Sequence, residues 1–235
     1  MLVGKSCGPP PAQRRSSRFL TFTLRQPLRL QSPTAWTCLV GNLALCSGQT
    51  LLIRGATSAL GQAALNIAVD LGATVIATTR NAERRPMLER LGATHVLVGE
   101  TARVADVLSI APTGVDAVLD LLGTATLLDS LAMSRTGGRV CIAGFLAGGH
   151  GLEKFDPVFQ LPSGVQLSAF ASALAFGSAS HPLSAIPFQE FVRKAASGTY
   201  RAKPARVFDF DEIAAAHRLM DSNGAGGKVV VTVQA

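Results

Sequence analysis

The stretch "LLIRGATSALGQAALNIAVDLGATVIATTR" (residues 51–80) contains an apolar run, a turn of small residues, an apolar-periodic segment and a second apolar run. Short branched-apolar runs predict buried strands, and the longer periodic segment between them predicts a helix. The stretch therefore predicts a β-α-β unit. Its turn, "GATSALG" (residues 55–61), lies where the first strand enters the helix, so backbone N–H groups and the positive helix end face outward together.

The same alternation continues along the chain. Further strands are predicted at residues 95–99, 115–120, 138–144 and 165–171, with helices at 84–91, 102–110 and 124–134. Apolar strands separated by helices indicate a parallel sheet covered on both faces. We predict an α/β fold, a doubly wound Rossmann-type sheet of order 3-2-1-4-5-6. A helix (187–197), a strand in "RVFDF" (206–210), a second helix (211–222) and a closing strand (228–233) follow.

Composition limits the possible classes of protein. The chain has 235 residues, 48% hydrophobic and 16% charged, which suffices for one sizeable core. No apolar stretch reaches the roughly 18 residues that a membrane span requires, so no membrane partner is expected. The net charge of +7 comes from the start of the chain, because seven basic residues and no acid precede Asp70. Since stacking aromatics do not accompany these residues, we expect no nucleic-acid partner.

The basic segment 1–33 has two interpretations. Its composition is that of a mitochondrial transit peptide, but it also fits a disordered or misassigned leader, because "CGPPPAQ" (7–13) interrupts a helix. We therefore expect a cytoplasmic protein, with a mitochondrial location as the alternative. The four cysteines and four histidines are scattered without a C-x-x-C pair, so neither a disulfide framework nor a metal site is predicted.

The small-residue turn is suited to a phosphate. The backbone at Ser58, Ala59, Leu60 and Gly61 is predicted to hold a pyrophosphate, because the turn is rich in small residues that let the backbone approach it. Gly61 also lets the helix approach the strand closely. Ala56 and Ser58 occupy the first two glycine places of the G-x-G-x-x-G fingerprint. The motif alone is therefore also compatible with a plain tight β-α turn.

The end of the second strand indicates which cofactor the turn would bind. An NAD site places an acid here to accept a hydrogen bond from the ribose 2′-hydroxyl, whereas this chain has "TTRNAERR" (78–85). The donors suited to a 2′-phosphate are Thr79, Arg80, Asn81 and Arg84. We predict NADP(H). The alternative is a solvated helix start in which arginines pair with neighbouring glutamates, as we expect for Arg85 and Arg90.

Several landmarks together resemble one known family. They are "GATSALGQAALNIA" (55–68), "LGATVIATTR" (71–80), "RLGATHVL" (90–97), "GVDAVLDLLG" (114–123), "TGGRVCIAGF" (136–145) and "FDEIAAAHRLMDSNGAGGKVVV" (210–231). In this order they resemble the cofactor-binding half of the medium-chain dehydrogenase/reductase superfamily, in its zinc-independent quinone oxidoreductase and enoyl reductase branch. The resemblance implies a Rossmann domain over 34–200, a segment over 201–235 that returns to a catalytic domain, and NADPH-dependent hydride transfer to a quinone or conjugated carbonyl.

The resemblance also implies further cofactor-binding residues. Arg84 falls where relatives carry a basic residue for the 2′-phosphate. The loop that approaches the nicotinamide contains Gly144, Phe145 and Leu146, and the C-terminal segment contributes Asn223 and Lys228. Gly99 replaces a tyrosine that often follows the third strand. Since the sixth strand of this family pairs with its copy, residues 165–171 predict a homodimer.

The family's GroES-like catalytic domain has no counterpart in the 33 residues before "TAWTCL" (34–39). Two function classes therefore remain, an NADPH-dependent reductase and a cofactor-binding module without turnover. The strand in 206–210 is expected to lack a sheet partner and to expose an apolar edge. No catalytic side chain is predicted, because the available candidates have structural explanations: Asp120 ends a strand, Ser134 lies in a helix, His150 in a flexible loop and Tyr200 in a turn.

Overall fold

The structure is a computed structural model that describes residues 31–99, 103–148, 151–201, 204–222 and 224–233. Residues 1–30 of the predicted leader, together with His150 and Asn223, lie outside the described residues. Helix α2 (Gln31–Trp36) begins before the proposed domain boundary at residue 34, and Ser32 and Pro33 are buried in it.

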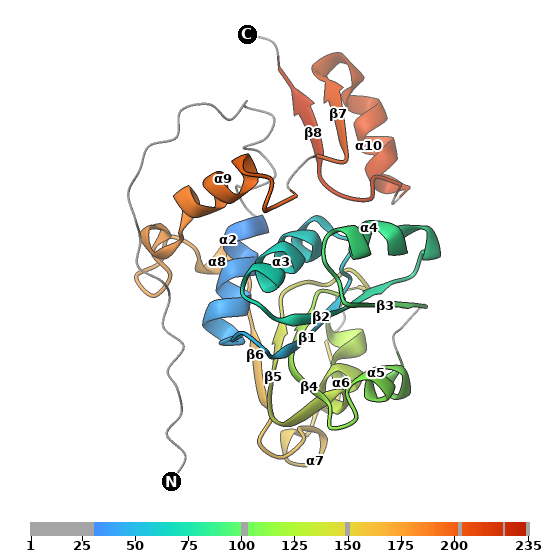
Figure 1. The fold of residues 1–235 in the computed structure, drawn as a ribbon, viewed down its shortest axis with the longest axis vertical. Coiled ribbons are helices and arrows are strands. Elements are labelled where there is room, and N and C mark those ends of the chain that lie inside the picture. Colours follow the sequence, from blue (N-terminus) through green and yellow to red (C-terminus); the bar gives the residue numbers. More distant parts are fainter. Residues whose placement is uncertain (1–30, 100–102, 149–150, 202–203, 223, 234–235) are drawn as a thin grey trace.

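Six strands form one parallel sheet in the predicted order, β3-β2-β1-β4-β5-β6 (Figure 1). They are β1 (Thr50–Arg54), β2 (Thr74–Thr79), β3 (His95–Val98), β4 (Val115–Asp120), β5 (Ser134–Ile142) and β6 (Gln166–Ala169). The chain thus runs outward from β1 to β3 and then returns to add β4 on the other side of β1. The carboxyl ends of β1 and β4 meet at this reversal, where ligands of doubly wound sheets bind.

Two hydrophobic cores explain why the strands are apolar throughout. On β1, Leu51 and Ile53 pack into one core, and Leu52 points into the other. The first core lies beneath α2, the π-helix η2 (Thr37–Asn42), α3 (Ala59–Asp70), α4 (Arg85–Arg90) and α9 (Phe188–Ala196). The second lies beneath α5 (Val104–Ile110) and α6 (Leu127–Ala132). Helices therefore cover both faces of the sheet, as the sequence predicts.

Short helical turns complete the connections between the larger elements. They are η3 (Ala82–Arg84), η4 (Thr124–Thr126), α7 (Pro157–Gln160), α8 (Ser172–Ala175), η5 (Leu183–Ala185) and η6 (Phe210–Glu212). Among the described residues no helix has the length and apolarity needed to cross a membrane.

The C-terminal segment corrects one prediction. Strand β7 (Arg206–Asp209) was expected to lack a sheet partner, but it pairs in parallel with β8 (Val229–Thr232), with Arg206 opposite Val229. Helix α10 (Ile213–Asp221) connects the two strands, so the segment is a β-α-β unit of its own beside the main sheet (Figure 1). The prediction was wrong because it treated the closing strand separately, although a helical crossover lets two such strands pair.

A second correction concerns Ser134. It was predicted to lie in a helix, but α6 ends at Ala132 and Ser134 is the first residue of β5. The register between β4 and β5 shifts near Val115, and this irregularity lets β5 begin earlier than its apolar core.

Candidate cofactor-binding site

The turn after β1 is the candidate phosphate cradle that the sequence predicts. Gly55 has a φ of +81°, which a residue with a side chain rarely adopts. Ser58 caps α3, and its Oγ accepts a hydrogen bond from the N–H of Gly61 at 3.0 Å. A Cβ atom on Gly61 would lie 2.6 Å from the carbonyl oxygen of Gly55, so only glycine allows the helix to approach the strand this closely. The backbone of Ala59 then starts the helix, while the Leu60 side chain packs against the core.

The end of β2 lies beside this turn. Thr78 accepts hydrogen bonds from the N–H groups of Gly55, through Oγ1, and of Ala56, through its carbonyl oxygen, both at 3.2 Å. Thr79 is buried, and its Oγ1 accepts from the N–H of Asn81 at 3.2 Å. Arg80 is exposed, and within the described part of the chain its side chain makes no hydrogen bond or ion pair. Its guanidinium is thus available to a ligand.

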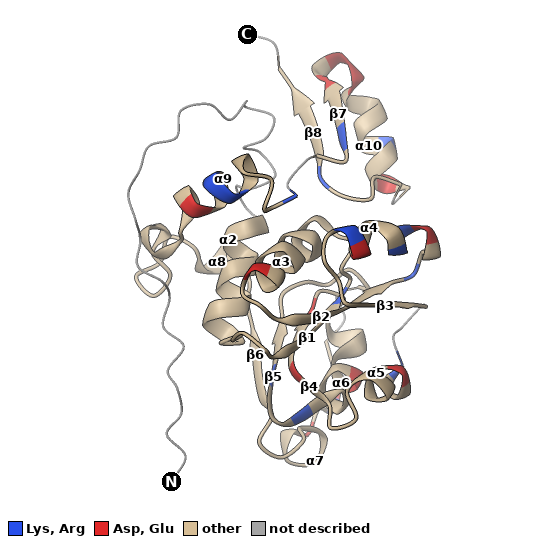
Figure 2. Ribbon diagram, viewed as in Figure 1, with Lys and Arg blue, Asp and Glu red and all other residues tan. Residues whose placement is uncertain are grey.

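The arginines beyond Arg80 differ in their contacts. Both basic and acidic residues occur along η3 and α4 (Figure 2). Arg85 forms the expected ion pair with Glu89 at 3.7 Å. For Arg90 no such pair is seen among the described residues. Arg84, assigned to a phosphate by the resemblance, donates from Nη2 to the carbonyl oxygen of Gly224 at 3.2 Å.

The C-terminal segment reaches the turn through Gln62, which sequence reasoning missed. Its Nε2 donates to the carbonyl oxygens of Thr57, at 2.8 Å, and Gly226, at 3.0 Å. A Cβ atom on Gly226 would collide with the Arg84 guanidinium. Lys228, predicted to lie near the cofactor, comes two residues after Gly226. Its carbonyl oxygen accepts a hydrogen bond from the N–H of Ala205 at 2.8 Å. Residues 224–228 are therefore fixed beside both the phosphate turn and Arg84.

The loop after β5 lies on the other side of the turn. A Cβ atom on Gly55 would lie 3.3 Å from Cδ1 of Leu146, so the turn and the loop are in contact. The Phe145 and Leu146 side chains are 76% and 61% exposed, which leaves apolar surface next to the cradle. The structure thus brings together the predicted residues of the turn, the end of β2, the loop 144–146 and the C-terminal segment.

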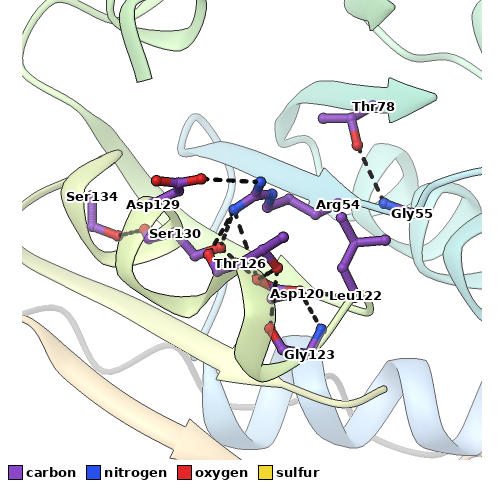
Figure 3. Close-up of polar contacts among 10 residues, drawn as sticks. All are labelled: Arg54, Gly55, Thr78, Asp120, Leu122, Gly123, Thr126, Asp129, Ser130 and Ser134. Atoms are coloured by element: carbon purple, nitrogen blue, oxygen red, sulfur yellow. Dashed lines mark hydrogen bonds and ion pairs between the residues drawn. The ribbon is translucent and has the colours of Figure 1, made fainter. Parts of the chain in front are cut away.

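A buried ion pair lies directly beneath the site. Arg54 and Asp120 are register partners at the ends of β1 and β4, and neither is exposed to solvent. Figure 3 shows the cluster that surrounds them. Nη1 of Arg54 lies 3.9 Å from Oδ2 of Asp120 and donates to the Thr126 carbonyl oxygen and to Ser130 Oγ, each at 2.8 Å. The cluster therefore holds two strand ends together by charge as well as by backbone pairing.

The other edge of the Arg54 guanidinium has fewer hydrogen-bond partners. Nε and Nη2 are buried without a hydrogen-bond partner among the described residues, and Nη2 lies 3.9 Å from Oδ2 of Asp129. Burial lowers the pKa of Arg54, while the charges of Asp120 and Asp129 oppose this shift. A guanidinium keeps its charge at ordinary pH, so this is a charged and partly unpaired group inside the core.

Arg54 was counted from the sequence only among the seven basic residues that precede Asp70, and no role was assigned to it. The available signal was an arginine at the end of a strand buried on both faces, since a charge in that place needs a buried partner. Asp120 was the nearest candidate, at the end of a neighbouring apolar strand.

The rejected catalytic candidates have structural roles. Asp120 is fully buried in the cluster just described, and Ser134 Oγ donates to the Ser130 carbonyl oxygen at 3.1 Å. Tyr200 is buried, and its hydroxyl donates to Asp70 at 3.2 Å. Among the described residues, no three His, Cys, Asp or Glu side chains are grouped so that they could hold a metal ion.

Comparison with known proteins identifies the family. Residues 59–179 match the family model described as zinc-binding dehydrogenase. The chain belongs to this family. It is a medium-chain dehydrogenase/reductase domain, as the order of its landmarks indicates.

Three relatives show the range of similarity. The chain is 29% identical over 205 residues to a mycocerosic acid synthase-like polyketide synthase of Mycobacterium tuberculosis, covering 86% of this chain and 10% of that protein. It is 30% identical over 213 residues to a 2-haloacrylate reductase of Burkholderia sp., covering 88% and 62%. The solved structure of CurK enoyl reductase has 27% identity and a TM-score of 0.76, covering 92% and 64%. The chain thus spans less than two thirds of each of these relatives.

Proposed function

We propose that this medium-chain dehydrogenase/reductase domain binds NADP(H) at the carboxyl ends of β1, β2, β4 and β5. The observation that supports this most strongly is the phosphate cradle at Ser58–Gly61 beside the exposed Arg80. In the proposed site, the N–H groups of Ala59 and Leu60 hold the pyrophosphate, because those of Ser58 and Gly61 already donate within the turn. Arg80, Asn81 and Arg84 hold the 2′-phosphate. The absence of a side chain at Gly61 lets the start of α3 lie directly against the end of β1, because a Cβ atom there would be 2.6 Å from the Gly55 carbonyl oxygen.

The reaction we propose is the reduction of a conjugated carbonyl compound or a quinone. The cofactor supplies the hydride, and the protein must orient it against an acceptor and exclude water. Two relatives carry names for the reduction of a conjugated double bond, an enoyl reductase and a 2-haloacrylate reductase. The exposed Phe145 and Leu146 offer an apolar surface for such an acceptor beside the cradle.

The first experiment measures binding and turnover separately. NADPH and NADH are titrated into the purified chain, and NADPH oxidation is then followed with a panel of quinones and enones. Ala59→Asp adds bulk and negative charge to the cradle, so the variant should fold but no longer bind NADPH. Unchanged binding by this variant would place the cofactor elsewhere.

One observation favours a second function, a cofactor-binding module without turnover. Phe145 and Leu146 are largely exposed, so the described residues do not enclose an acceptor against the loop that contains them. Hydride transfer requires a desolvated acceptor, and an open site fails to provide one. NADPH binding without oxidation by any acceptor in the panel would support this second function.

We also propose that the domain forms a homodimer through β6. This strand pairs only with β5 in the sheet of the described residues, and its other edge is open. Leu167 at its centre is half-buried, and no charged residue protects the edge. Sedimentation should show a dimer at micromolar concentration, and Leu167→Lys should shift it to the monomer. A stable monomer that this substitution leaves unchanged would contradict the proposal.

A further inference from the structure

The carboxylate of Asp120 divides its hydrogen bonds between two parts of the molecule. Oδ1 accepts from the backbone N–H groups of Leu122, at 2.8 Å, and Gly123, at 3.0 Å. Oδ2 accepts from the hydroxyls of Thr126, at 2.9 Å, and Ser130, at 2.5 Å (Figure 3). One oxygen therefore fixes the loop after β4, and the other fixes the following η4 and α6. If Asp120 served only as the counter-ion of Arg54, it would not need hydrogen bonds to the loop.

The loop that Asp120 holds is bonded in turn to the loop after β5. The N–H of Leu146 donates to the carbonyl oxygen of Leu121 at 3.1 Å, and that of Ala147 donates to Leu122 at 2.9 Å. A Cβ atom on Gly144 would lie 2.6 Å from the Leu121 carbonyl oxygen. The two loops are thus in direct backbone contact, and a shift of the first must move the second.

Both loops also touch the phosphate turn. A Cβ atom on Gly55 would lie 3.3 Å from Leu146 and 3.4 Å from both Leu121 and Leu122. Gly55 directly follows Arg54, the register partner of Asp120. Asp120 therefore lies beneath the point where the turn and the two loops meet.

We propose that Asp120 is a positioning residue, whose Oδ1 sets the conformation of residues 121–123 and thereby the place of the Gly144–Leu146 loop beside the phosphate turn. This inference rests on the proposed function, because the loop contacts the nicotinamide only if NADP(H) occupies the site. Asp120 does not touch the reacting atoms itself. It acts through backbone hydrogen bonds on the surface that the nicotinamide would meet.

The test separates the acceptor oxygen of Asp120 from its charge. Arg54→Met removes the buried cation, so that residue 120 can then be made neutral without leaving an unpaired charge. On this background, Asp120→Asn keeps an oxygen for the two loop N–H groups, whereas Asp120→Leu keeps the approximate size but removes the acceptor. The two double variants differ in the feature that the proposal invokes.

Two ligands report on the two ends of the site. The fragment 2′-phospho-ADP-ribose lacks the nicotinamide, so calorimetry with it reports the phosphate end alone. NADPH adds the nicotinamide, whose fluorescence emission reports its surroundings. In the Asp120→Leu double variant we expect fragment affinity within about twofold of the unmodified chain, but NADPH affinity lowered about tenfold and nicotinamide emission like that of free NADPH. The Asp120→Asn double variant should retain bound-state emission.

Ser130→Ala provides a second, single-site control. It removes the hydrogen bond that Ser130 donates to Oδ2 and the one that its Oγ accepts from Arg54, but it leaves the contacts of Oδ1 in place. It should therefore lower stability without changing nicotinamide emission. If Asp120→Leu retains the emission and NADPH affinity of its Asn counterpart, the positioning role is wrong while the proposed function stands. If the unmodified chain binds neither ligand, the proposed function and the positioning role both fail.

Discussion

Two arginines end adjacent strands of the same sheet, and the structure uses them in opposite ways. Arg54, at the end of β1, is fully buried and lies 3.9 Å from Asp120. Arg80 follows β2 on the same edge, is exposed and makes no ion pair within the described residues. The difference shows that a basic residue at the carboxyl edge is no guide to ligand binding until its burial is known. The buried arginine is a structural charge, and the exposed one is the candidate ligand contact.

The largest expected effect comes from removing the buried arginine. Arg54→Met leaves the Asp120 carboxylate inside the core without its counter-ion, so the free energy of unfolding should fall by about 3–5 kcal/mol. Adding Asp120→Asn removes the remaining charge and should recover much of this loss. Urea unfolding followed by circular dichroism measures both changes. A loss below about 1 kcal/mol for Arg54→Met would show that the pair contributes little.

Removing the exposed arginine should affect binding and leave stability unchanged. Arg80→Ala loses a charge-assisted contact to the 2′-phosphate of about 1.5–3 kcal/mol, so NADPH affinity should fall about tenfold or more while NADH affinity hardly changes. Arg84→Ala should act in the same direction. Arg90→Ala removes an equal charge from an exposed position on α4 and serves as the control. Equal affinities of the unmodified chain for NADPH and NADH would contradict the assignment.

The turn between these two arginines offers a test of the cradle's packing. Gly61→Ala places a Cβ atom 2.6 Å from the Gly55 carbonyl oxygen, and the backbone must move apart to admit it. Such overpacking costs about 1–3 kcal/mol of unfolding free energy and should also weaken NADPH binding. Gly41→Ala is the matched control, because its Cβ atom would meet Thr37 at an ordinary 3.7 Å. Equal stability of the two variants would show that the backbone of the turn can move to admit the Cβ atom without loss of stability.

The smallest expected effect is a pH dependence of stability that arises from Lys194 and Tyr200, which both contact Asp70. Burial, together with the Asp70 charge, raises the pKa of Tyr200. Burial lowers the pKa of Lys194, but hydrogen bonds to Asp70 and Glu190 outweigh this and raise it overall. Because both folded-state pKa values are raised, their stabilisation is complete below the unfolded values near 10 and is lost as pH rises beyond them.

The free energy of unfolding should therefore fall by about 1 kcal/mol per pH unit above about pH 10, as urea titrations at pH 8–11 would show. Tyr200→Phe removes the ionising hydroxyl and should reduce this slope, at the expense of its hydrogen bond to Asp70. An identical slope in this variant would assign the alkaline effect to other groups.

The parts of the candidate site could be placed at one edge of the sheet from the sequence, because they follow strand ends. The turn at Ser58–Gly61 and the residues after Thr79 lie at one edge of the sheet in the structure, as parallel pairing requires. The contact between Gln62 and Gly226 could not be read in this way. The two residues are far apart in the chain, and no local pattern relates a glutamine side chain to a distant backbone carbonyl.

The sequence by itself determined the α/β class, the strand order and the place of the turn, because these depend on local periodicity and on the topology of β-α-β units. Only the tertiary structure decided that β7 pairs with β8, and that Arg54 and Asp120 form a buried pair beneath the site. Burial and hydrogen bonding depend on neighbours from every packed element. An arginine side chain is therefore a candidate ligand contact where it is exposed and a structural charge where it is buried.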